Sequence, residues 1–164
     1  MSDKIQAPAR LSAAFRSERR TSANWGGCRV WASNDGLIYK QVGSTYGGAR
    51  YGAVSANLGT SNTDTLGVAL AGLGGQLLSG SAADVAANQM LLMVGDASGG
   101  EYINYQTATL TAAKAYNLTG LARGAYRSKP VAKLANQAQF VRVDSSIAKS
   151  EPLQPSQVGQ KLFV

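Results

Sequence analysis

The stretch that decides the fold is residues 28–42, which read CRVWASNDGLIYKQV. Two runs rich in β-branched and aromatic residues, 28–33 and 37–42, are separated by Asn-Asp-Gly at 34–36. Asn, Asp and Gly tolerate the positive φ angles of a tight turn, and such a turn between two strand-like runs indicates a β-hairpin. We therefore predict a hairpin here, with Trp31 in its first strand as a large buried anchor of the core.

The rest of the chain carries further short strand-like runs, each bounded by Gly, Asn, Ser or Asp. They are residues 51–56, 66–71, 90–94, 101–105, 108–111, 115–118 and 139–143. Short strands at this spacing are typical of an all-β sandwich or barrel. The sequence therefore predicts a mainly β fold class, an antiparallel β-sandwich or barrel-like domain.

One or two short helices are expected beside these strands. Residues 82–88 follow Ser81, which can cap a helix, and Asp84 stands three residues further on, as a capping box requires. A second helical turn is predicted near 131–136. Neither segment is long enough to make this an α/β protein.

The chain has 164 residues, which suits one domain, or one domain with a tail. Residues 1–24 are rich in Ser, Ala and Arg without sustained apolar periodicity, so we expect a basic arm or linker there and a β-rich domain over 25–164. The longest uncharged stretch, 65–83, is broken by five glycines, and no membrane span is expected. The start lacks the apolar block of a signal peptide, which favours synthesis in the cytoplasm.

Composition argues against an enzyme. The sequence has no histidine, one cysteine (Cys28) and nine acidic residues spread thinly along the chain. This excludes a Ser-His-Asp or Cys-His-Asn catalytic centre, an internal disulfide framework and a thiolate metal cluster. We expect no catalytic activity, no cofactor and no metal site.

The net charge of +7 is unevenly distributed. Residues 51–113 contain four acidic and no basic residues, whereas 114–164 contain eight basic and two acidic residues. The segments 1–23 and 24–50 carry +3 and +2. Such segregated charge favours complementary docking between copies or neighbours over the wrapping of a nucleic acid.

Two glycine-containing segments partly match known site motifs. Residues 72–77 follow an apolar strand, as a phosphate-binding loop does, but they lack the Lys that such a loop needs, so a plain turn is favoured. Residues 33–39 partly resemble the Asp-box turn of propeller glycosidases, which repeats in those proteins and does not repeat here. We expect Asp35 to bond its own turn backbone.

Acidic and aromatic residues supply the remaining candidates. Glu101 is a lone acid with no second carboxylate near it in sequence, so a glycosidase pair is disfavoured and an ion pair with Arg123 or Arg142 is expected. Seven tyrosines offer stacking surfaces for sugars or bases, and aromatic and basic residues interleave over 116–127. Half-buried tyrosine is common in strands, so nucleic-acid binding is not expected.

Six short motifs follow one another along the chain: WGG at 25–27, VWASNDG at 30–36, GEYI at 100–103, YNLTGLARG at 116–124, FVRVD at 140–144 and VG at 158–159. This series resembles the C-terminal β-rich domain of the large tail-tip or baseplate-hub proteins of long-tailed phages and gene transfer agents, including tip attachment proteins. The residues that carry the resemblance are Trp25, Gly26, Gly27, Trp31, Asp35, Gly36, Glu101, Leu118, Leu121, Arg123, Gly124, Phe140 and Asp144. The chain departs from the family at 125–128, where AYRS stands in place of a second glycine and a threonine.

The resemblance implies a virion structural protein, without catalytic activity, that serves tail assembly and host-cell attachment at the tail tip or baseplate. It implies a ring of copies, a trimer being favoured, with other phage tail and baseplate proteins as partners. On the cell side, the resemblance allows either a host surface glycan or a host receptor as the partner. An alternative hypothesis is a free carbohydrate-binding β-sandwich that uses its tyrosines on cell-surface glycans.

Arg123 has a physical role that can be stated from its neighbours. Leu118 and Leu121 flank Gly120 where a strand turns a corner, and Arg123 stands directly before Gly124. A guanidinium there can donate a fork of hydrogen bonds to carbonyls or to a carboxylate. We therefore predict that Arg123 is structural.

Overall fold

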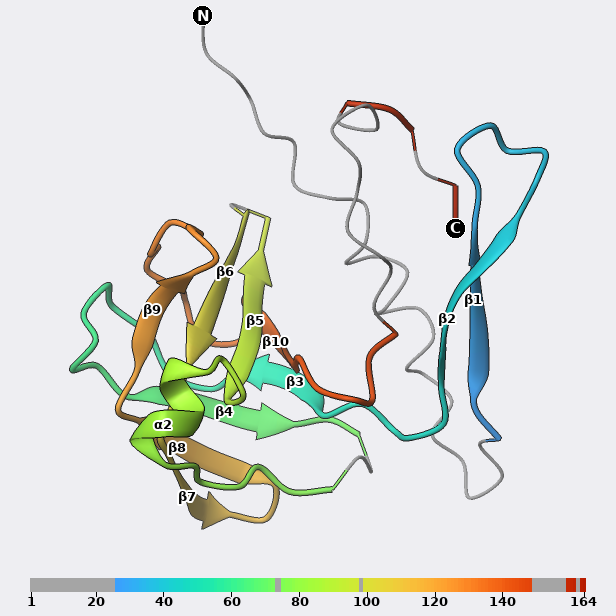
Figure 1. Cartoon of the computed structure of the whole chain (residues 1–164). Helices are drawn as coiled ribbons and strands as arrows, with labels where there is room; N and C mark the ends of the chain where they lie inside the picture. Colours follow the sequence, from blue (N-terminus) through green and yellow to red (C-terminus); the bar gives the residue numbers. More distant parts are fainter. Residues whose placement is uncertain (1–25, 73–74, 98, 149–158, 162) are drawn as a thin grey trace, which may run out of the picture. The chain divides into compact units, whose positions relative to one another are not determined.

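The computed structural model describes residues 26–72, 75–97, 99–148, 159–161 and 163–164, coloured in Figure 1. The predicted arm 1–24 and Trp25 lie outside the described residues. Residues Ala49–Asp144 form one compact unit, and the described residues of 26–48 and 145–164 form another. This division falls inside the predicted domain 25–164.

The unit 49–144 contains an eight-stranded sheet. Its strands are β3 (Tyr51–Val54), β4 (Leu66–Leu70), β5 (Leu91–Asp96), β6 (Gly99–Asn104), β7 (Thr107–Ala112), β8 (Ala115–Thr119), β9 (Ala122–Ala125) and β10 (Gln139–Arg142). The order across the sheet is β7-β8-β4-β3-β10-β5-β6-β9, and every pairing is antiparallel. The predicted mainly β fold is confirmed.

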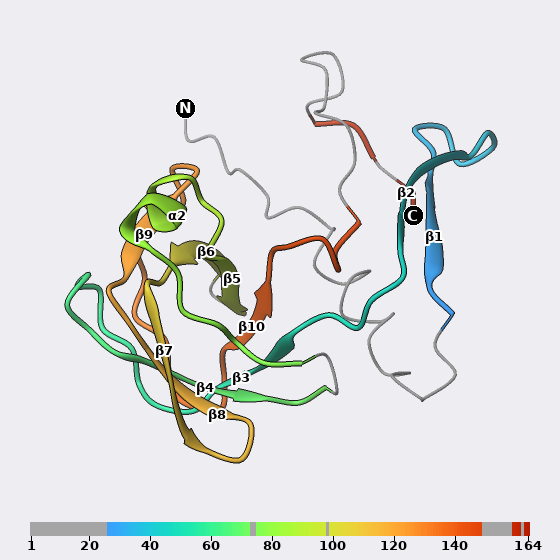
Figure 2. The same cartoon turned by 60° about the horizontal axis from the view of Figure 1, so that its bottom comes forward.

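One long, bent hairpin supplies both ends of this sheet. β6 runs on into β7 and β8 into β9, so that β6 pairs with β9 while β7 pairs with β8. At the bend, Gln106 N donates to Thr119 O at 3.0 Å and Gly120 has a φ of +66°. The two halves therefore close the sheet into a sandwich-like form, and in Figures 1 and 2 the β6–β9 half lies above the β7–β8 half.

The hydrophobic core is formed by side chains from several strands of this sheet. Its fully buried side chains include Val54, Leu66, Val68, Leu92, Val94, Ile103, Tyr105, Leu118 and Phe140. Three residues that carry the resemblance, Leu118, Leu121 and Phe140, belong to this cluster. Burying a side chain of this size stabilises a fold by about 1.5–3 kcal/mol, so these positions support the sheet.

A short helix, α2 (Ala82–Ala86), precedes β5. Its capping box is formed as predicted, because Ser81 Oγ accepts from Asp84 N at 3.2 Å and Asp84 Oδ2 accepts from Ser81 N at 2.8 Å. The second helical turn predicted near 131–136 lies later in the chain, where Gln137 N and Ala138 N both donate to Leu134 O at 3.3 Å, and the start of the predicted range is not helical. Lys133 instead exchanges two backbone hydrogen bonds with Leu58, each of 2.9 Å, so that the chain there is extended.

The unit that contains the N-terminal hairpin has a two-stranded sheet of β1 (Cys28–Ala32) and β2 (Lys40–Thr45). The hairpin is present as predicted, but β2 begins three residues later than the predicted run 37–42. Asp35 explains the shift, because its Oδ1 accepts the N–H groups of Leu37 at 2.8 Å and Ile38 at 2.9 Å and keeps both in the turn. Asp35 therefore bonds its own turn backbone, as expected.

The prediction that Trp31 is buried in the core is wrong. Its exposed fraction is 47%, and the burial of β1 alternates so that Arg29 and Trp31 share the exposed face. The physical reason is that a two-stranded ribbon buries little on its own. Strand propensity correctly predicted that Trp31 lies in β1. It does not indicate whether other elements pack on the face of the strand that carries Trp31.

Candidate functional site

A buried ion pair joins two strands that the chain places far apart. Glu101 lies in β6 and Arg123 in its sheet neighbour β9. Arg123 Nε lies 2.6 Å from Glu101 Oε1, and Arg123 Nη2 lies 2.5 Å from Glu101 Oε2. The exposed fractions of the two side chains are 2% and 0%. The expected ion pair of Glu101 is therefore made with Arg123. Its bidentate geometry is the one that gives the strongest arginine–carboxylate ion pairs.

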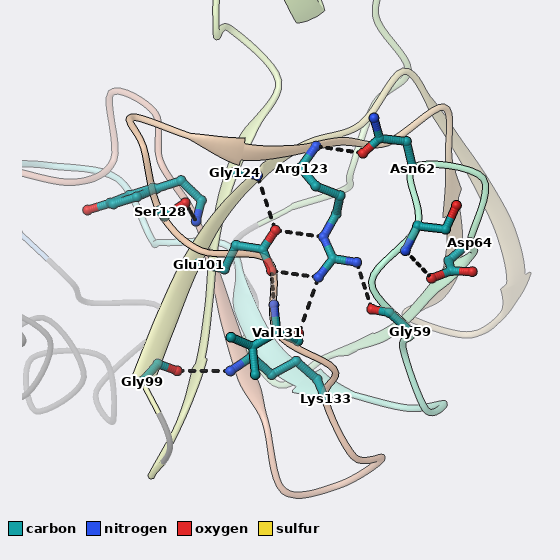
Figure 3. A network of polar contacts seen from close by, with 12 residues as sticks. Gly59, Asn62, Asp64, Gly99, Glu101, Arg123, Gly124, Ser128, Val131 and Lys133 are labelled. Carbon is teal, nitrogen blue, oxygen red and sulfur yellow. Dashed lines mark hydrogen bonds and ion pairs between the residues drawn. The ribbon is translucent and has the colours of Figure 1, made fainter.

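The carboxylate of Glu101 also holds the two ends of one loop. Oε1 accepts the N–H of Gly124 at 3.1 Å, and Oε2 accepts the N–H of Val131 at 3.2 Å (Figure 3). With Arg123, each oxygen accepts two hydrogen bonds, which uses the four acceptor positions of a carboxylate. Glu101 is thus occupied as an acceptor and is poorly placed to act as a general base.

The remaining donors of Arg123 reach two backbone carbonyls. Nη1 donates to Gly59 O at 2.8 Å and Nη2 donates to Val131 O at 3.2 Å. Its backbone N–H donates to Asn62 Oδ1 at 3.1 Å, so that the loop before β4 covers the outer edge of β9. The predicted fork to carbonyls and a carboxylate is present, and it ties three segments together.

Arg142, the other partner considered for Glu101, has a different environment. It donates through Nη1 to Leu91 O at 3.0 Å and through Nη2 to Gln89 O, and its guanidinium carbon lies 5.5 Å from the ring centroid of Tyr105. Burial raises the pKa of the Tyr105 hydroxyl. These contacts place Arg142 in a separate structural cluster.

A second buried cation lies beside the same loop. Lys133 is 1% exposed, and its Nζ lies 3.3 Å from Asp96 Oδ1 and donates to Gly99 O at 2.9 Å. The sequence around Lys133 gives no sign of its burial, because a lysine is ordinarily exposed whatever its neighbours are. Only the pairing of its backbone with Leu58 brings it inside.

We call residues 124–131 the anchored loop, because Glu101 binds both of its ends. Its tip is a tight turn closed by Ser128 N donating to Ala125 O at 3.1 Å. The two central residues, Tyr126 and Arg127, have φ angles of +53° and +60°. Asn and Gly normally fill such positions, and each bulkier residue costs about 1–2 kcal/mol there.

Ser128 and Gly124 hold this strained turn in place. Ser128 Oγ donates to Ala125 O at 2.8 Å and accepts the N–H of Tyr102 at 2.9 Å. Gly124 has a φ of +72°, and a Cβ there would lie 2.9 Å from Ser128 O, so only glycine fits. The turn is therefore fastened to β6 and to the ion pair.

The anchored loop presents an aromatic side chain and two cations. Tyr126 is 69% exposed, and its ring meets that of Tyr102 edge to face, at 81° with centroids 5.7 Å apart. Arg127 and Lys129 are exposed on the same loop. The sequence shows that aromatic and basic residues interleave here, and the structure shows that Tyr126, Arg127 and Lys129 are the ones exposed on this loop.

The other residues that carry the resemblance are distributed over both units. Asp144 pairs with Arg50 at 2.5 Å and lies 3.9 Å from Arg142. In the hairpin unit, Gly36 has a φ of +74° against the Phe163 ring, and at Gly27 a Cβ would lie 2.6 Å from Thr45 O, whereas Gly26 has open space around it. The structure therefore brings together Glu101, Arg123 and Gly124, whereas Leu118, Leu121 and Phe140 lie in the core.

Three further expectations concern a metal site, a membrane span and the glycine-containing segment 72–77. Over the part of the chain that the structure describes, no three or more Cys, Asp or Glu residues are grouped so that they could hold a metal ion. Among those same residues, no helix has the length and apolar character needed to cross a membrane. The segment 72–77 includes residues 73–74, which lie outside the described residues.

Comparison with known proteins gives one match. Residues 48–141, more than half of the chain, match the family model described as Rcc01698-like, C-terminal. The matched range nearly coincides with the compact unit 49–144, and it includes the ion pair and the whole anchored loop. No curated protein and no solved structure matches the chain.

Proposed function

We propose, from the premise that this chain belongs to the Rcc01698-like C-terminal family, that it is a structural component of a phage or phage-like tail tip or baseplate hub. In this proposal it has no catalytic activity and takes part in tail assembly and host-cell attachment. The ordered series of motifs from WGG to FVRVD is its first support.

The observation that carries the proposal is that three motif residues form a buried network under an exposed loop. Glu101, Arg123 and Gly124 together fasten an exposed loop to the sheet, and every acceptor position of the carboxylate is taken. An attachment protein needs a rigid scaffold that holds a surface loop in one conformation, because preorganisation lowers the entropic cost of binding. A buried, saturated ion pair supplies that rigidity.

The proposed partners are further copies of the chain, arranged as a ring around the tail axis with a trimer favoured, and other tail and baseplate proteins. The proposed location is the virion. Support comes from the segregated charge of segments 51–113 and 114–164. Internal pairs use Glu101 and Asp96, but Asp64 and Asp84 in the first segment can still attract the cations of the second segment in a neighbouring copy.

The test is to locate the chain on particles. Tailed particles would be purified from cells that encode the chain with a short epitope tag, and then examined by gold labelling and by reconstruction. Label and density at the tail tip are expected. Untagged particles serve as the control, and tagged particles with no copy at the tip would overturn the proposal.

The alternative function, a free carbohydrate-binding module, is favoured by one observation. Three tyrosines, Tyr39, Tyr46 and Tyr126, keep large parts of their rings exposed. A glycan array with the full chain separates the two functions when read together with the labelling. Glycan binding by a chain that never enters particles would favour the free module.

A further inference from the structure

We propose that the anchored loop, residues 124–131, binds an anionic saccharide, meaning a sugar that carries a carboxylate or a phosphate group. The inference rests on the attachment role in the proposed function, and it names the surface and the chemical class of the cell-side partner. Neither the motif series nor the family match assigns a ligand to this loop.

The first argument is charge. Residues 102–143 contain six basic residues and no acidic residue. Three of them, Arg123, Lys133 and Arg142, are engaged in ion pairs or in hydrogen bonds to carbonyls. Within the described part of the chain, the side chains of the other three, Lys114, Arg127 and Lys129, make no hydrogen bond or ion pair.

Two of these three cations lie in the anchored loop. The two acids of β5 and β6 already have partners, because Glu101 pairs with Arg123 and Asp96 pairs with Lys133. The loop therefore presents two uncompensated positive charges to its surroundings. The planar guanidinium of Arg127 can take a carboxylate or a phosphate in two parallel hydrogen bonds, and the ammonium of Lys129 can add a point charge.

The second argument is the aromatic ring beside these cations. Tyr126 is mostly exposed, and the edge-to-face contact with Tyr102 holds its ring in one orientation. The apolar C–H face of a sugar ring packs well on an open aromatic face. A single oriented ring next to two cations fits one charged sugar unit. Single-stranded nucleic acid needs a row of stacking platforms, which one ring does not provide.

The third argument is backbone strain. Tyr126 and Arg127 both hold positive φ angles that Asn and Gly would adopt at lower cost, as asparagines do at positions 88 and 136. Bulky residues kept in such a conformation mark positions where the side chains themselves are needed. Here the loop is fastened at both ends and at Ser128, so that both side chains are held ready for a ligand.

The experiment uses the full chain and three variants. The double variant Tyr126→Asn with Arg127→Gly puts Asn-Gly at the turn and removes both ligand groups. Arg127→Gln keeps the side-chain size and the strained backbone but removes the charge. Lys114→Gly is the matched control, because Lys114 has a φ of +62° and carries a free charge in a different hairpin turn.

Binding is measured by calorimetry with an oligogalacturonate, a phosphorylated oligosaccharide, a neutral dextran oligomer and oligo-dT, and each variant is also melted. We expect binding to at least one anionic saccharide and weak or no binding to dextran and oligo-dT. The double variant should melt at a higher temperature than wild type yet bind at least tenfold more weakly. Arg127→Gln should bind more weakly with little change in melting, and Lys114→Gly should bind as wild type does.

Several results would overturn the inference: a folded double variant that binds as tightly as wild type, equal binding of dextran, or preferred binding of oligo-dT. Failure to bind either anionic saccharide overturns this inference alone. Absence of the chain from the tail tip overturns the proposed function alone, so the two failures are distinguishable.

Discussion

Arg123 shows how one side chain can connect distant segments. Its guanidinium contacts Glu101 from β6, Gly59 from the loop before β4, and Val131 at the end of the anchored loop. Burying two charges is costly, and the cost is offset only where the geometry is good and the remaining donors and acceptors are satisfied. Both conditions hold here, so removal of either partner would leave a buried charge unpaired.

We predict that Arg123→Lys destabilises the protein. Lysine keeps the charge but cannot donate to both oxygens of Glu101 and to two carbonyls at once, so we expect a loss of about 2–3 kcal/mol in the free energy of unfolding. Thermal and urea unfolding measure this loss. Arg127→Lys, at an exposed position, is the matched control and should change stability by less than about 0.5 kcal/mol. An unchanged melt together with lost adhesion would instead make Arg123 a contact residue.

The titration of Asp35 supplies a second prediction. Hydrogen bonds from Ile38 N, from the Ser33 hydroxyl and from Leu37 N lower the pKa of its carboxyl from 3.8 to about 2. Because the folded-state pKa lies below the unfolded one, this stabilisation is complete above pH 3.8 and is lost as the pH falls through about 2.

NMR titration of the Asp35 carboxyl carbon is the measurement. We expect a midpoint near 2 in the folded chain and one near 3.8 in urea. Amide exchange at Leu37 and Ile38 should become faster over the same acidic range. The same midpoint in both states would contradict the turn described for this hairpin.

Among the elements, the bend in the long hairpin formed by β6–β7 and β8–β9 determines the order of strands in the sheet. It allows β7 to lie at one end of the strand order while β6, the preceding strand in the chain, lies next to β9 at the other end. Gly120 stands at the bend with a φ of +66°, and a Cβ there would lie 2.8 Å from Gln106 Cβ. Both the backbone conformation and the close approach therefore require glycine.

We predict that Gly120→Ala lowers the free energy of unfolding by roughly 1–2 kcal/mol or more, because the new Cβ meets a side chain in a strained backbone. Gly75→Ala is the control: its φ is +93°, but nothing lies within 4 Å of an added Cβ. The difference between the two variants in urea unfolding measures the steric contact. Equal losses would mean that the bend itself is not tightly packed.

For the whole molecule, the uneven charge predicts salt-dependent assembly. Residues 51–113 carry no basic residue and 114–164 carry an excess of them, so copies that dock through opposite charges should separate as salt screens them. Sedimentation of the full chain between about 50 and 500 mM salt measures this, and a marked loss of oligomer is expected at a Debye length of a few ångströms. Assembly that does not respond to salt would contradict the charge argument.

Local patterns were sufficient for much of the fold. The strands other than β9, the capping box at Ser81 and the self-bonded turn at Asp35 all follow from residues close together in sequence. β9 was missed because its sequence, ARGA, has no strand propensity and is held by its pairing with β6. The start of β2 was misplaced because a side chain extended the turn.

The sequence by itself determined the fold class, because strand and turn patterns are local. It also limited the candidate ion-pair partners of Glu101 to two arginines, Arg123 and Arg142. Only the tertiary structure decided that Arg123 is that partner, that Lys133 is buried, that Trp31 is exposed and that Tyr126 stands on a strained turn. The physical reason is that burial and ion pairing depend on which strands become neighbours. In this chain, a bent hairpin brings residues 59, 101, 123 and 131 together.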